Sequence, residues 1–249
     1  MSNIIAAFIT GTANILSSVI TFRRKSTHLA KQKNIPELNL NNIFCIPEEN
    51  DLREKRMQDI LLEKTSTLRL LARSGFSYLH SQGPNWRNKT KQESEEGGIG
   101  WLLEKKVPMI VILENPYCEN GKCRLRADGN SKPWRDLSWE RIQEINKKYR
   151  NLDLYFTAVP ILCSIFITDS SAVYDPYHLG KLPTAETSKN HFLVFEFQKP
   201  KKNVQHNYYE QLWHHFEFVL KDELTISFEQ FERKYRDILN VRSSFKYNT

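Results

Sequence analysis

Several side chains able to bind a ligand stand at the ends of segments that are typical of strands. Arg73 ends the apolar segment 67–73, and Asn115 follows the buried-strand pattern at 107–113. Ligands of open α/β sheets bind in the loops at strand ends. We therefore expect one cleft that combines a guanidinium, an amide, a carboxylate and two phenols, supplied by Arg73, Asn115, Asp169, Tyr174 and Tyr177. The alternative is that Arg73 pairs with Asp169 while the tyrosines only close the core.

Two histidines near an acid offer a second kind of chemistry. His178 and His191 flank a loop close to Asp175, and a His–Asp pair can act as a general base, with Cys163 or Ser164 as its nucleophile. The chain has no nucleophile-elbow, P-loop, dinucleotide-binding or HExxH motif. We therefore expect no catalytic residues, and an enzyme remains the alternative.

The cysteines do not follow a metal-binding pattern. Cys118 and Cys123 lie five positions apart around an Asn-Gly pair, and no second pair of ligands stands at a suitable spacing. A chain of 249 residues is long enough to build a core without disulfide bonds. We expect neither a metal ion nor a cofactor.

Strand-like and helix-like segments alternate along the body, which predicts an α/β fold with a mixed sheet flanked by helices. Residues 26–64 are expected to form a tether and a helix, 65–200 the α/β domain, and 201–249 the C-terminal helices. Ser227 and Gln230 make a capping box for the last helix. The expected strands are 67–73, 107–113, 153–159, 161–168 and 190–198, and the expected helices are 51–64, 99–105, 138–150, 204–222 and 227–239.

The order of elements between residues 67 and 197 resembles one half of a phospholipase D-type domain. In that family a strand pair carries His-x-Lys-x4-Asp, where the histidine attacks phosphorus and the lysine holds the phosphate oxygens. Leu162 and Ser164 stand at the positions of the histidine and the lysine here, and only Asp169 matches. The continuation Ile-Thr-Asp-Ser to Tyr177 is similar to inactive domains of bacterial regulatory and conflict proteins. The resemblance implies a single inactive half that binds or senses a ligand without cleaving it.

An uncharged apolar segment begins the chain. At about 1.5 Å per residue, residues 4–22 span just under the ~30 Å of a bilayer core. Arg23, Arg24 and Lys25 follow it, and no acid occurs before Glu37. The positive-inside rule then places the body in the cytoplasm and residues 1–25 at the inner (cell) membrane. The segment either spans the bilayer or lies in its interface as an amphipathic helix.

Small and hydroxyl-bearing residues recur at helical spacing within this segment. Such residues let membrane helices approach closely and hydrogen-bond to one another. We expect the segment to associate into a homo-oligomer through Ala7, Thr10, Gly11, Asn14, Ser17 and Thr21. The alternative is a single anchor that does not self-associate.

The balance of 36 basic and 29 acidic residues gives a formal net charge of +7, which favours anionic partners. Together these features indicate a membrane-attached sensor or effector. One version is a toxic, membrane-perturbing component of a bacterial antiphage defence system, kept inactive by a ligand or by a regulatory protein, nucleic-acid or nucleotide partner. The first alternative is a nuclease or phosphodiesterase with a displaced site. The second is a nucleic-acid-binding module that uses the aromatic helix near Lys199.

Overall fold

The computed structural model describes residues 39–46, 49–62, 65–73, 79, 100–127, 139–176, 192–201 and 207–244. The expected membrane helix and its self-association residues, Ala7 to Thr21, lie outside these ranges, as do Tyr177, His178 and His191. Among the helices within these ranges, none combines the length and the apolar character that a membrane crossing requires.

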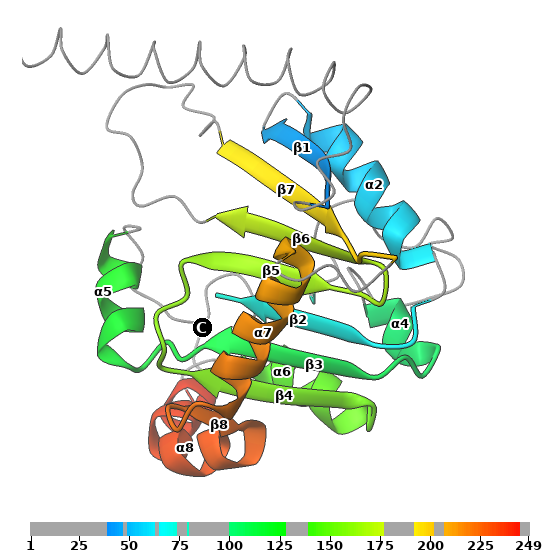
Figure 1. Ribbon diagram of the computed structural model, residues 1–249. Helices are drawn as coiled ribbons and strands as arrows, with labels where there is room; N and C mark the ends of the chain where they lie inside the picture. The colour runs from blue at the N-terminus through cyan, green and yellow to red at the C-terminus, as the bar shows by residue number, and fades with distance from the viewer. Residues whose placement is uncertain are drawn as a thin grey trace, which may run out of the picture.

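The body is built on one mixed sheet of eight strands, in the order β1-β7-β6-β5-β2-β3-β4-β8 (Figure 1). Strands β2, β3 and β4 run parallel to one another, and every other neighbouring pair is antiparallel. The prediction of an α/β fold with a mixed sheet is therefore confirmed. The strands are β1 Leu40–Ile46, β2 Leu68–Ala72, β3 Met109–Glu114, β4 Leu152–Thr157, β5 Cys163–Ile167, β6 Ser171–Pro176, β7 Phe192–Gln198 and β8 Thr225–Ser227.

Helices cover both faces of the sheet and give it two apolar layers. On one face α7 buries Tyr209, Phe216 and Val219 against the strands. On the other face α2, α4, α6 and α8 pack against a larger apolar cluster. Figure 1 shows α7 crossing the near face of the sheet, with α8 beside β4 and β8. The helices are α2 Asn50–Leu62, α4 Gly100–Glu104, α5 Glu119–Ala127, α6 Trp139–Lys148, α7 Tyr208–Lys221 and α8 Phe228–Ser244.

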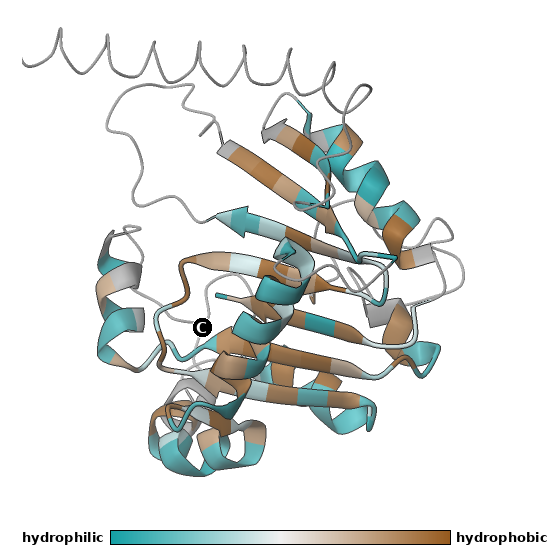
Figure 2. Ribbon diagram, viewed as in Figure 1, coloured by the Kyte–Doolittle hydropathy of each residue, from teal (hydrophilic) through white to brown (hydrophobic). Residues whose placement is uncertain are grey.

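The central strands supply both layers because successive side chains of a strand point to opposite faces. Leu70 and Val111 join the larger cluster, whereas Leu71 and Ile112 join the cluster under α7. The central strands are accordingly hydrophobic along most of their length (Figure 2). Burying each such side chain stabilises the fold by about 1.5–3 kcal/mol.

The long periodic segments are found where the sequence predicts them. The capping box of α8 is also confirmed, because the Ser227 amide donates to Gln230 Oε1 at 2.9 Å and the Gln230 amide donates to Ser227 Oγ at 3.3 Å. Four further elements, β1, β6, β8 and α5, occur where the sequence analysis expects none. Strand β1 lies within the stretch expected to be a tether, and it pairs antiparallel with β7.

Candidate functional site

Arg73 and Asn115 lie at the same edge of the sheet, as expected. Strands β2 and β3 are parallel with Ala72 opposite Leu113, so the residues that follow them meet at one edge. Arg73 Nε lies 3.4 Å from a carboxylate oxygen of Glu114, the residue that ends β3. The first two members of the expected cleft are therefore close together, and Arg73 already has an acidic partner.

Asn115 has a structural task at this edge. Its side chain is only 4% exposed, its Oδ1 accepts from the Tyr117 amide at 2.9 Å, and its Nδ2 donates to the Tyr235 hydroxyl at 3.0 Å. These bonds fold the turn between β3 and α5 and fasten it to α8. Asn115 thus uses both ends of its amide within the fold.

Asp169 lies at the opposite edge of the sheet. Strand β5 runs antiparallel to β2 with Ile167 opposite Arg69, so Asp169 comes beside the start of β2 and accepts from the Ser66 amide and the Thr67 hydroxyl. At about 3.3 Å per residue, β2 separates this carboxylate from Arg73 by roughly 20 Å. The structure therefore brings Asp169 neither into a cleft with Arg73 nor into an ion pair with it.

The hydrogen bonds at Asp169 explain why the pKa of its carboxyl group is lowered. Partial burial raises the pKa of its carboxyl group, but the bonds from Ser66 and Thr67 outweigh that effect and hold the pKa below the usual value. The carboxylate joins the β5–β6 turn to the start of β2. The acidic residue matched to the phospholipase D pattern thus connects two strand ends.

Tyr174 lies on the face of the sheet that α7 covers, near the carboxyl end of β6. Its ring is 6.2 Å from that of Phe195, and its hydroxyl interacts with the thiol of Cys163 on the neighbouring strand. Burial raises the pKa of Cys163 to about 11, so this thiol stays protonated at neutral pH. Leu162 is 64% exposed and Ser164 is buried.

A group of charged residues that the sequence analysis missed joins α2 to the sheet. We call this group, Arg53, Arg56, Asp175 and Glu196, the α2 joint. Arg56 holds the carboxylate of Glu196 in a bidentate pair, with Nη2 2.7 Å from Oε1 and Nε 3.0 and 3.1 Å from the two oxygens. The Glu196 side chain is completely buried in β7. A buried charge of this kind is tolerated only when it is paired and hydrogen-bonded.

Glu196 is also the meeting point of three strands. Asn41 Nδ2 donates to it at 2.9 Å, the amide of Asn42 donates to its second oxygen, and the Ser171 hydroxyl lies 3.5 Å from Oε1. Two residues of β1, one of β6 and one of α2 therefore converge on a single carboxylate of β7. This network fixes β1 and α2, the first described elements of the chain, to the sheet.

The second pair of the joint is looser, and its carboxylate is more exposed than that of Glu196. Arg53 Nη1 is 3.4 Å from Asp175 Oδ2, and the two side chains are 17% and 21% exposed. Burial raises the pKa of Asp175 to about 6, although the positive charge of Arg53 opposes the shift. Asp175 is opposite Ser164 at the carboxyl end of β6, which is the hydrophilic end of that strand (Figure 2).

One sequence signal could have found part of the joint. Glu196 is the single charged residue in the apolar run of β7, on the same face as the buried Val194. An acid at a core position implies a buried basic partner. The choice of Arg56 as that partner depends on how α2 lies on the sheet, and local sequence does not encode it.

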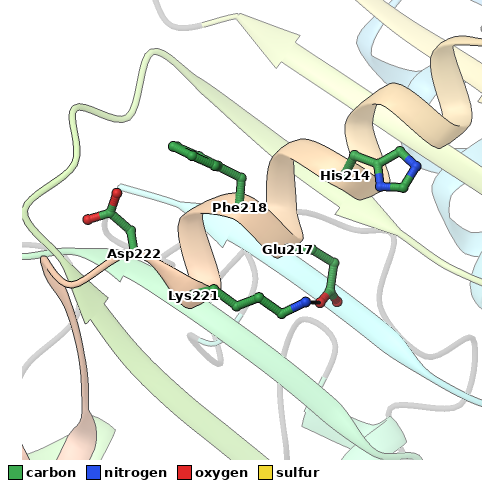
Figure 3. A pocket seen from close by; sticks show the side chains of 5 residues that line it. All are labelled: His214, Glu217, Phe218, Lys221 and Asp222. Atoms are coloured by element: carbon green, nitrogen blue, oxygen red, sulfur yellow. Dashed lines mark ion pairs between the residues drawn. The ribbon is translucent and has the colours of Figure 1, made fainter.

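A second charged surface follows the outer side of α7. His214, Glu217, Phe218, Lys221 and Asp222 line an open hollow of about 510 Å³ (Figure 3). Glu217 pairs with Lys221 at 3.2 Å and with Arg69 at 3.5 Å, and the Arg69 guanidinium stacks 3.7 Å from the Trp213 ring. Within the described ranges, no three side chains of the metal-binding types gather in one place. Glu217 thus pairs with Lys221 on its own helix and, through Arg69, holds α7 to β2.

No protein-family model matches the chain, and a search of curated proteins finds no match.

Proposed function

We propose that the chain is a membrane-attached sensor or effector whose α/β body controls the N-terminal segment through the α2 joint. The observation that carries this proposal is the place of the joint. Strand β1 and helix α2 come first after the N-terminal segment, and the Arg56–Glu196 network fastens both to β6 and β7. Within the described part of the chain, these two elements are the nearest in sequence to the N-terminal segment.

A joint made of charges suits control by a ligand or partner. Apolar contacts depend on buried area and offer no specific group for a ligand to compete for. An arginine–carboxylate pair is directional, and another anion can replace its carboxylate. A ligand or regulatory partner that changes these pairs would change how firmly β1 and α2 are held.

In the version we favour, the body is a single inactive phospholipase D-like half, and the N-terminal segment is the active part. Leu162 has no group that can attack phosphorus, which supports a body that senses a ligand. The released segments associate through Thr10, Asn14 and Ser17 and breach the membrane, as expected for a toxic effector of an antiphage defence system. The body lies in the cytoplasm.

The experiment compares the full chain with a chain lacking residues 1–25, both expressed in bacteria. We expect the full chain in the membrane fraction and the shortened chain in the supernatant. Expression of the full chain with Glu196→Gln, which weakens the joint, should lower the membrane potential, measured with a potential-sensitive dye. Replacing Thr10, Asn14 and Ser17 by leucine in that variant should restore the potential. Equal fractionation of the two chains, or an intact potential in every variant, would refute the proposal.

A further inference from the structure

The two arginines of the joint lie one turn apart on the same side of α2, yet their hydrogen bonding differs. Arg56 makes three short contacts with Glu196. Arg53 makes a single contact with Asp175, at 3.4 Å from Nη1. A guanidinium carries five N–H donors in a planar fork that suits two parallel bonds to an oxyanion. Arg53 therefore uses little of its donor capacity.

The unused donors of Arg53 are partly buried. Its Nε is shielded from solvent, and among the residues that the structure describes none accepts a hydrogen bond from it. A buried donor without an acceptor destabilises the folded state. A ligand oxygen placed against Nε would remove that cost, which gives the position an intrinsic affinity for an acceptor.

The surroundings of Arg53 favour a negative ligand and leave a way in. Arg53 lies in the first turns of α2, a helix of 13 residues, where the helix dipole attracts anions. Asp175 stands at the carboxyl end of β6, and strand ends are the usual ligand positions of α/β sheets. The side chains of Arg53 and Asp175 are 17% and 21% exposed, so a small molecule can reach the pair from solvent.

We propose that Arg53 binds a small oxyanion, a carboxylate or phosphate group of the ligand, which takes its N–H donors in place of Asp175. The inference rests on the proposed function, because it names the chemical class of ligand that the α2 joint senses. Asp175 acts as an internal competitor for the same guanidinium. Once the ligand is bound, Arg53 holds its oxyanion in the same bidentate geometry in which Arg56 holds Glu196.

The competition gives opposite effects for two variants at one site. Asp175→Asn removes the internal carboxylate with almost no change in size, so the oxyanion binds more tightly. Arg53→Gln removes the fork and the charge, so the oxyanion is lost. Since hydrogen bonds to charged groups contribute about 1.5–3 kcal/mol, each change corresponds to about a 10- to 100-fold shift in Kd.

The test is isothermal titration calorimetry on the detergent-solubilised full chain at constant ionic strength, with inorganic phosphate and malonate as separate probes. We expect Asp175→Asn to tighten the binding of at least one probe about tenfold or more, and Arg53→Gln to abolish it. The probe that gains more identifies the ligand group as phosphate or carboxylate. Lys221→Gln, which removes an exposed cation on α7, is the matched control and should leave both affinities unchanged.

Equal affinities for the wild type and Asp175→Asn, or binding that survives Arg53→Gln, would overturn the site. If Arg53→Gln does not fold, as judged by circular dichroism, Arg53→Lys replaces it, because lysine keeps the charge but lacks the fork and should bind about tenfold more weakly. Membrane fractionation of the same chains tests the proposed function separately. A chain that fractionates with the membrane but binds neither probe refutes the anion site alone.

Discussion

Glu196 is the side chain whose replacement should test the joint most directly. Its carboxylate is completely buried and receives hydrogen bonds from Arg56, Asn41 and Asn42. In Glu196→Gln one acceptor oxygen becomes a donor that faces other donors, and Arg56 keeps its charge beside a neutral amide. The change therefore breaks a buried ion pair and leaves one partner in place.

The loss of unfolding free energy in Glu196→Gln depends on how exposed Arg56 and Glu196 are. Breaking a buried pair by removing one partner costs about 3–5 kcal/mol. Arg56 is 24% exposed and can turn its guanidinium partly toward water, so we expect the lower end of that range, about 3 kcal/mol. A domain of ordinary stability stays folded after such a loss, and its midpoint in urea should fall by about 1–2 M.

The assay is urea unfolding of the full chain, followed by circular dichroism, within a double-mutant cycle. Arg56→Met and Glu196→Leu should each cost about 3 kcal/mol, and the double variant clearly less than their sum, with a coupling energy of about 2–3 kcal/mol. Lys221→Gln, which breaks an exposed pair on α7, should cost only about 0.3 kcal/mol. A coupling below about 0.5 kcal/mol, or a Glu196→Gln midpoint equal to that of Lys221→Gln, would refute the reasoning.

Three further predictions concern other parts of the fold. The pKa of Asp175 is about 6 in the folded protein and ordinarily 3.8, so the folded state binds more protons than the unfolded state between these pH values. The free energy of unfolding should therefore fall by at most about 3 kcal/mol as the pH rises from 4 to 6. In Asp175→Asn the urea midpoint should change less over this pH range. A methyl group at Gly121 would lie 2.4 Å from the Asn115 carbonyl oxygen, so Gly121→Ala should lower stability by about 1–3 kcal/mol, measured as a lower melting temperature. Cys163 is buried and Cys123 is exposed, so mass spectrometry should find iodoacetamide on Cys123 in the native protein and on Cys163 only after unfolding.

Local sequence pattern predicts the elements that bury a regular apolar face. The segments around β2, β3 and β5 are apolar enough for a strand buried on both faces, and the capping box of α8 lies within four consecutive residues, 227–230. Local pattern does not predict strand β1, because Asn41 and Asn42 interrupt its apolar residues. Their amides bind Glu196, 154 or more positions further along the chain. Sequence pattern misses helix α5 because the helix has few apolar residues and carries Gly121 in its first turn.

Sequence pattern also predicts only part of the candidate site. Arg73 and Asn115 come to one edge because parallel neighbouring strands end together, a rule that needs only the order of elements. Asp169 goes to the other edge because β5 runs antiparallel to β2, a direction that its own residues do not specify. A single antiparallel strand thus separates Asp169 from the residues with which its place at a strand end had grouped it.

The two arginines of α2 show why the residue type alone does not decide between structure and function. Arg56 faces a carboxylate that is wholly buried and shared with two asparagines, so this ion pair holds β1 and α2 in place. Arg53 faces a carboxylate at a strand end, with a longer contact and access to solvent. The weaker pair is the one from which an outside anion displaces the carboxylate more easily. Because both arginines belong to one helix, a ligand at Arg53 acts on the element that Arg56 and Glu196 fasten to the sheet.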